Sequence, residues 1–111
     1  MRLKLMGEKQ VIIAIPDGEI DHHSAEKIRT AIDTEVARTN AVNVIFDFRN
    51  VTFMDSSGIG IILGRYRLVY ALGGTVVVFG VSDAVRRVLD MSGIDKIIKI
   101  TTNLDNALML I

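Results

Sequence analysis

The sequence predicts an α/β fold, a single domain over residues 1–111 with a mixed sheet of about five strands and about four helices. From residue 42 onward, short apolar runs alternate with segments of helical periodicity in the order β-α-β-α-β-α. Such alternation implies parallel strands joined by right-handed helical crossovers. Half of the 111 residues are hydrophobic, so one core can be buried although the chain has no Cys.

The N-terminal segment predicts a β-hairpin. Leu3 and Leu5 alternate with basic residues, and the apolar run Val11–Ile15 follows a glycine-containing turn at residues 6–9. The segment 16–18, Pro-Asp-Gly, ends the second strand, because Pro donates no ladder hydrogen bond and Asp-Gly favours a turn.

The first helix is expected just after Asp21, a good N-cap residue. Apolar residues then recur at helical spacing, at Ala25, Ile28, Ile32 and Val36. The next run, residues 42–48, predicts a strand in which alternate apolar side chains share one face. These side chains are Val44, Phe46 and Phe48.

The remaining elements follow the same periodicities and stop signals. They are a helix from Ser57 to about Leu72 ended by Gly73-Gly74, a strand at 75–79, a helix between Ser82 and Gly93, a strand at 97–100, and a helix over 104–110 capped by Asn103.

The most informative segment is residues 53–60, Phe-Met-Asp-Ser-Ser-Gly-Ile-Gly, at the junction of a strand and a helix. Ligands and partners usually bind at this edge of an open α/β sheet. The simplest interpretation is that Asp55 or Ser56 caps the helix and that Ser57 is an ordinary first-turn residue. A P-loop is excluded because no Gly-Lys-Ser/Thr follows, and a nucleophile elbow because its flanking glycines are missing.

A helical wheel divides the helix from Ser57 into two apolar sides. The side expected to face the sheet holds Ile59, Ile62, Leu63, Tyr66, Val69 and Tyr70. The opposite side holds Ser57, Ile61, Gly64, Leu68 and Leu72, with Arg65 beside them. Either neighbouring helices bury this second side, or it docks another protein.

The segment 53–66, supported by 18–26 and 90–94, resembles the anti-sigma factor antagonists of the STAS domain family. The resemblance covers essentially the whole chain and is closest to the members of the sporulation sigma-F pathway. One departure is Asp83, where the family often has Pro at the start of the third helix.

The resemblance implies a regulator that is not an enzyme, and no cofactor is expected. The lack of Cys and of a secretory signal at the start favours the cytoplasm. Family members bind an anti-sigma factor that is also a serine kinase, and so release the sigma factor. The kinase phosphorylates the second serine of the motif, Ser57 here, and a serine phosphatase restores binding. Ser56 is the weaker candidate and is expected to be a cap. The free protein is expected to be a monomer, with no direct contact with nucleic acid or membrane.

The predicted partner-binding residues combine the motif, two stretches that resemble the family's docking surfaces, and the second apolar side of the helix. They are Glu19, Asp21, His22, Asp55, Ser56, Ser57, Gly58, Ile61, Arg65, Arg67 and Leu68. A phosphate on Ser57 would have Asp55 as an acidic neighbour. If the loop before the first helix comes close, it would also meet Asp21 and Glu19, so that the switch can work by repulsion.

Other functions remain open at this point. The chain could serve a stress-response pathway, or be a small hydrolase with Ser57 as nucleophile, if His22 or His23 lay within about 3 Å of it. The Asp21-His22-His23 sequence is better explained as a solvated first turn than as a metal site, because no second His or Cys cluster exists. A formal net charge of zero argues against binding driven by nucleic-acid phosphates.

Overall fold

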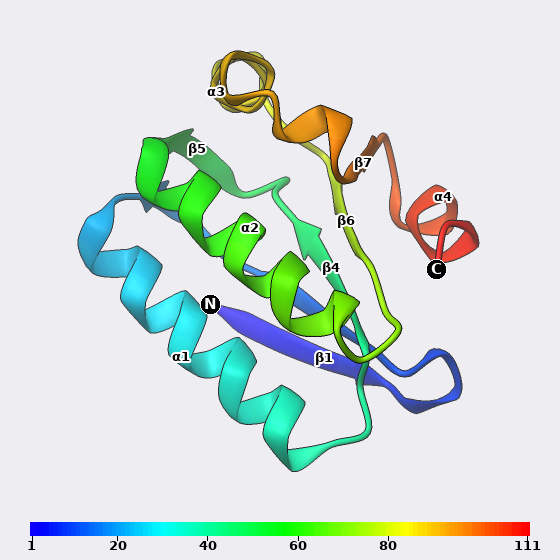
Figure 1. The fold of residues 1–111 in the computed structure, drawn as a ribbon. Helices are drawn as coiled ribbons and strands as arrows, with labels where there is room; N and C mark the ends of the chain where they lie inside the picture. The colour runs from blue at the N-terminus through cyan, green and yellow to red at the C-terminus, as the bar shows by residue number, and fades with distance from the viewer.

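The computed structural model describes residues 1–111 and is built around a five-stranded mixed sheet (Figure 1). Across the sheet the strands run in the order β1 (Arg2–Met6), β2 (Val11–Ile15), β4 (Asn43–Asp47), β6 (Val76–Phe79) and β7 (Lys99–Thr101). The hairpin pair β1 and β2 is antiparallel, and every other neighbouring pair is parallel. The predicted α/β class, the hairpin and the mixed sheet are confirmed.

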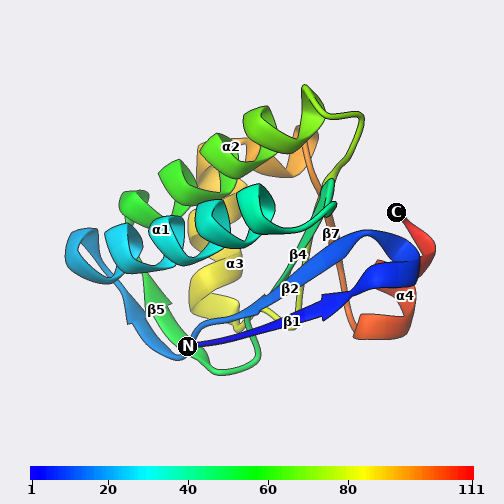
Figure 2. The same cartoon turned by 90° about the horizontal axis from the view of Figure 1, so that it is seen from below.

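A second ladder joins β3 (Gly18–Ile20) to β5 (Val51–Met54), which pair in parallel. Neither strand was predicted, because three or four residues are too few to establish an alternation of polar and apolar side chains. The ladder places the segment that leads into the first helix beside the segment that leads into the second (Figure 2).

The four helices are α1 (His22–Arg38), α2 (Ser56–Tyr70), α3 (Asp83–Ser92) and α4 (Leu104–Met109). Three predicted N-caps are confirmed, since the side chains of Asp21, Ser82 and Asn103 each accept a backbone N–H from their own first turn. At α1 the cap is reciprocal, because the Ser24 hydroxyl also accepts the Asp21 N–H at 2.9 Å.

Two predicted boundaries differ from the structure. Helix α2 ends at Tyr70 because Gly73 takes a left-handed φ of 86° and the Gly74 N–H donates back to the Val69 carbonyl at 2.8 Å. The last strand begins at Lys99, two residues later than predicted. A short 3₁₀ turn over Ile94–Lys96 follows α3 and delays the chain's entry into the sheet.

Helices α1, α2 and α3 pack on one face of the sheet, and α4 covers the other (Figures 1 and 2). The predicted trio Val44, Phe46 and Phe48 lies in the larger core beneath the three helices. On the opposite face, side chains from β2, β4 and β6 form a smaller core against Ala107 of α4. Helices α1 and α2 lie side by side and begin at the same edge of the molecule (Figure 1).

The buried carboxylate at the end of β4 predicts an acid-sensitive contribution to stability. Asp47 is 2 % exposed, and Arg49 donates three hydrogen bonds to it, from its backbone N–H at 3.1 Å, Nε at 3.0 Å and Nη2 at 2.8 Å. Burial alone would raise the pKa of Asp47, but these bonds and the charge of Arg49 outweigh it and lower the pKa.

A lowered pKa in the folded state means that the stabilisation is complete above the unfolded value of about 3.9 and is lost as the pH falls below it. We therefore expect Asp47→Asn to lower the free energy of unfolding by about 1.5 kcal/mol at pH 7, a modest value because Arg49 is exposed. Urea unfolding at pH 7 and at pH 2.5 to 3 measures this difference. An equally large destabilisation at both pH values would contradict it.

Candidate functional site

The central motif lies where β5 passes into α2, and Asp55 is the N-cap of that helix. The Asp55 Oδ1 accepts the Ser57 N–H at 2.8 Å, and the Asp55 carbonyl accepts the Gly58 N–H at 3.0 Å. Of the two predicted caps, Asp55 is confirmed. Ser56 is the exposed first residue of α2, so the predicted capping role of Ser56 is wrong. Its short side chain is not needed there because the carboxylate of Asp55 already satisfies the free N–H of Ser57.

Ser57 is half-buried, and its hydroxyl takes part in no hydrogen bond within the chain. It lines a pocket of about 260 Å³ between the first turns of α1 and α2. We call this the Ser57 pocket; its walls are His22, Ala25, Glu26, Arg29, Ser57, Gly60, Ile61 and Arg65. The hydroxyl is therefore open to a modifying group rather than used in packing.

The β3–β5 ladder brings the acidic residues of both helix starts to one edge. Ile20 pairs with Met54, and the Ile20 carbonyl accepts the Asp55 N–H at 3.2 Å, so Asp21 and Asp55 follow neighbouring strands. Hydrogen bonds from the backbone and side chain of Ser24 lower the pKa of Asp21. The loop before α1 does come close to the motif, a point that the sequence left open.

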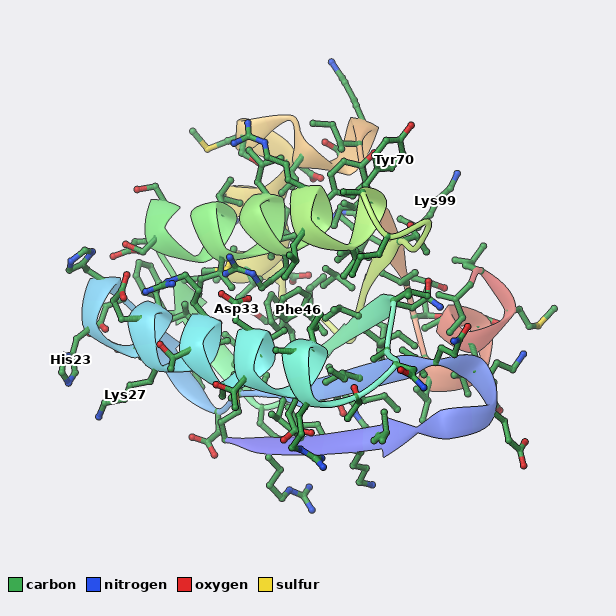
Figure 3. All side chains as sticks on the ribbon, turned by 60° about the horizontal axis from the view of Figure 1, so that its bottom comes forward. His23, Lys27, Asp33, Phe46, Tyr70 and Lys99 are labelled. Carbon is green, nitrogen blue, oxygen red and sulfur yellow. The ribbon has the colours of Figure 1, made fainter.

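Arginine side chains form the opposite end of the same pocket. Arg65 of α2 is 8 % exposed, and its Nε lies 3.0 Å from the Oδ1 of Asp33 on α1. Figure 3 shows Asp33 between the two helices. Arg29 forms ion pairs with both Glu26 and Asp33. Burial lowers the pKa of Arg65, and the charge of Asp33 opposes this, so the guanidinium stays protonated at neutral pH.

The second side of α2 is covered in its first half and open in its second. Ile61 is 6 % exposed and belongs to the main core, packed beneath α1 together with Arg65. Further along, Leu68 and Leu72 are exposed and line an open groove of about 760 Å³ between α1 and α2. Of the two alternatives, burial by a neighbouring helix thus holds for Ile61, whereas the residues near Leu68 remain available for docking.

The predicted inward orientation of Tyr70 is wrong. Tyr70 is 66 % exposed at the end of α2 (Figure 3). Its ring lies against that of Tyr66, tilted by 34° with 5.5 Å between centroids. The helical wheel assumes that the sheet underlies the whole helix, whereas the chain turns away immediately after Tyr70.

The structure divides the predicted partner-binding residues into three groups. One gathers at the helix starts: Glu19, Asp21, His22, Asp55, Ser56, Ser57 and Gly58. A second, Arg67 and Leu68, lines the groove along the second half of α2, and the third, Ile61 and Arg65, lies buried between the helices. Sequence reasoning missed the charged residues of α1 that face them, Glu26, Arg29 and Asp33. Their spacing places Glu26, Arg29 and Asp33 on one face of the first helix. No sequence pattern shows that this face packs against α2.

The histidines next to the motif differ in their surroundings. His22 lines the Ser57 pocket, but no hydrogen bond joins it to the Ser57 hydroxyl. His23 points away from α2 into solvent (Figure 3). No group of three or more His, Asp or Glu side chains is placed to hold a metal ion, and no helix has the length and apolar character to cross a membrane.

Residues 3–107 match the STAS domain family. An anti-sigma F factor antagonist of Paenibacillus polymyxa is 39 % identical over 108 residues, which cover 97 % of this chain and 92 % of the relative. An anti-sigma-B factor antagonist of Listeria monocytogenes is 32 % identical over 83 residues, 75 % of this chain and 72 % of that one.

Solved structures give the same likeness in three dimensions. The anti-sigma factor antagonist SpoIIAA in its unphosphorylated form superposes with a TM-score of 0.82 at 33 % identity, over 96 % of this chain and 91 % of that one. The Bacillus cell fate determinant SpoIIAA in its phosphorylated form gives a TM-score of 0.73 at 31 % identity, over 99 % and 98 % of the two chains. Both relatives thus share the arrangement of helices that surrounds the motif.

Proposed function

This chain belongs to the STAS domain family, and we propose that residues 1–111 form one STAS domain that acts in the cytoplasm as an anti-sigma factor antagonist. The observation that carries the proposal is the open hydroxyl of Ser57 at the start of α2, inside an Asp-Ser-Ser-Gly motif. The relatives named as anti-sigma factor antagonists support it, because one of them matches nearly the entire chain.

In the proposed cycle, the unphosphorylated protein binds an anti-sigma factor that is also a serine kinase, and so releases the sigma factor. The kinase transfers the γ-phosphate of ATP to the Ser57 hydroxyl, which loses its proton, and ADP leaves. The modified protein no longer binds. A serine phosphatase hydrolyses the phosphate and restores the hydroxyl. In this cycle the chain is the substrate of the kinase and performs no catalysis itself, which the relatives named as anti-sigma factor antagonists support.

The contact surface in this proposal runs from the two helix starts along the open part of α2. The exposed carboxylates of Glu19 and Asp21 lie at one end, and Arg67 and Leu68 lie at the other. Ser57 sits near the acidic end, so a partner that covers the helix starts must bury any group attached to it. The solved relative in a phosphorylated form supports modification as a normal state of such a domain.

Mass spectrometry tests the modified position directly. After incubation with ATP and the candidate anti-sigma F kinase, we expect one phosphate per chain, located on Ser57. The variant Ser57→Ala should take up none, and Ser56→Ala, which changes an exposed hydroxyl one residue away, should be modified as the wild type is. Phosphate on Ser56, or a fully active kinase that leaves this chain unmodified, would overturn the proposal.

The pathway has a second candidate, since the Listeria relative is an anti-sigma-B factor antagonist. We propose the sporulation sigma-F pathway because the sigma-F relative is more similar and matches more of the chain. A binding competition decides between them. The unphosphorylated protein should displace sigma F from its anti-sigma factor at concentrations at which it leaves the sigma-B complex intact.

A further inference from the structure

The Ser57 pocket holds an arginine whose hydrogen-bonding capacity is only partly used. Arg65 is 8 % exposed, and its Nη1 forms no hydrogen bond. Its Nε forms an ion pair with the Asp33 Oδ1 at 3.0 Å that lacks the alignment of a hydrogen bond, so the Oδ1 is unpartnered as well. Buried guanidinium groups normally have their donors satisfied, because an unmade hydrogen bond to a buried charge is costly. A buried donor without a partner, on a residue that lines a pocket, can bind an acceptor that enters the pocket.

The groups around Arg65 indicate where an anion bound in this pocket would come from. Ser57, Ile61 and Arg65 stand four residues apart on one face of α2, and long helical side chains point back toward the helix start. The Arg65 side chain therefore extends toward the start of α2, where Ser57 lines the same pocket. Arg29 of α1 lines the same pocket, and the start of α2 adds the positive end of its helix dipole.

We propose that the Ser57 pocket is an internal receptor for the phosphate of phosphorylated Ser57, which Arg65 binds from the buried side and Arg29 from the rim. The proposal rests on the proposed function, because it assumes that Ser57 carries a phosphate. It adds that the phosphate turns inward and is held by the domain's own arginines rather than extending freely into solvent.

The carboxylates of Asp55 and Asp21 at the helix starts oppose a phosphate here, so the arrangement depends on the charged groups that face the pocket itself. Two arginines face two carboxylates, Glu26 and Asp33, so the unmodified pocket is close to neutral apart from His22. Arg29 already divides its guanidinium between both carboxylates, and Glu26 lies on the exposed side of α1. A phosphate, with about −1.5 to −2 charges, competes with a single carboxylate for these donors.

An inward phosphate changes the switch in a specific way. The phosphate becomes a fixed negative charge between the first turns of α1 and α2. A partner that contacts either helix start therefore meets this charge. The phosphate also occupies Arg29 and Arg65, which leaves the carboxylates of Glu26 and Asp33 with less neutralisation.

Phosphorus NMR of the full chain, with phosphoserine installed at position 57 during translation, tests the receptor without any kinase. An arginine in contact favours the dianion, so the second pKa of the phosphate should fall by about 1 below its ordinary value near 6. In Arg65→Met the phosphate pKa should return most of the way to its ordinary value, because the buried donor is gone. The matched control Arg38→Met removes a positive charge from the far end of α1 and should leave the pKa unchanged.

Helix-dipole and Asp55 effects are common to all three proteins, so the difference between the two variants isolates Arg65. Should Arg65→Met fail to fold by circular dichroism, the wild type in buffer and in denaturing urea provides the comparison, and the rim variant Arg29→Met provides a smaller expected shift. A phosphate pKa that is no lower in the folded protein, or that responds equally to Arg65→Met and Arg38→Met, overturns the receptor. Neither result affects Ser57 as the kinase target, which mass spectrometry tests separately.

Discussion

Phosphorylation of Ser57 is expected to weaken binding to the anti-sigma factor about a hundredfold. The added group carries about −1.5 to −2 charges at pH 7, and the carboxylates of Asp55 and Asp21 lie at the same edge. These carboxylates repel the phosphate in the free protein as well, so only the additional cost in the complex lowers the affinity. When a partner excludes water from the site, one like-charge pair at about 5 Å costs roughly 3 kcal/mol at an effective dielectric constant near 20. A penalty of that size in the complex corresponds to about a hundredfold in affinity. Salt reduces it, because the site is partly exposed.

Calorimetric titration of the anti-sigma factor with three variants measures this effect. Ser57→Ala should bind as the unmodified wild type does and should not respond to the kinase, whereas Ser57→Asp should bind poorly. Ser56→Ala is the matched control, since it removes an exposed hydroxyl beside the site. Equal affinities of Ser57→Ala and Ser57→Asp for the partner would contradict electrostatic switching.

The same modification should leave the fold intact. A helix start favours a negative group by roughly 0.3–1 kcal/mol, and the Ser57 pocket gives the phosphate room. Far-ultraviolet circular dichroism of the modified and unmodified protein should therefore coincide. A large loss of helical signal on modification would show that the switch works by unfolding instead.

Gly58→Ala is expected to destabilise the domain by about 2 kcal/mol. Gly58 is buried in the first turn of α2, and a Cβ atom built on it would overlap the Cγ and Sδ atoms of Met54. Met54 is itself fully buried at the end of β5, so it cannot move without displacing neighbouring core side chains. The glycine of the motif is therefore explained by packing between the strand and the helix.

Gly60→Ala provides the matched control because it makes the same change two residues further along α2. No atom lies within 4 Å of a Cβ built on Gly60, so the substitution should stabilise the helix by up to about 1 kcal/mol. Thermal unfolding of both variants measures the pair. Two changes of the same sign would show that helix propensity, and not the contact with Met54, decides at Gly58.

Features that depend on nearby residues were predictable from the sequence. Asp21, Ser82 and Asn103 cap their helices because a short polar side chain can reach its own first turn whatever the rest of the chain does. The alternation of strands and helices likewise fixed the parallel part of the sheet, since few other topologies satisfy it.

Features that depend on packing between distant segments were not predictable. Periodicity placed Arg65 on the side of α2 away from the sheet, but its burial depends on α1 lying across that side, with Asp33 opposite. Tyr70 fits the apolar pattern of the side of α2 that faces the sheet. It is nevertheless exposed, because the end of α2 extends beyond the sheet. In both cases the missing information is the position of a neighbouring element.

Because of the short β3–β5 ladder, the proposed contact surface depends on the number of residues in the segments that lead into α1 and α2. The ladder fixes where α1 and α2 begin, and a slip of one residue in such a ladder turns every side chain to the opposite face. Ile20 and Met54 would then leave the interior, and the two halves of the surface would lose their alignment. Substitutions that keep the length of these loops are therefore expected to preserve the alignment of the two helix starts, whereas the insertion or deletion of one residue is expected to disrupt it.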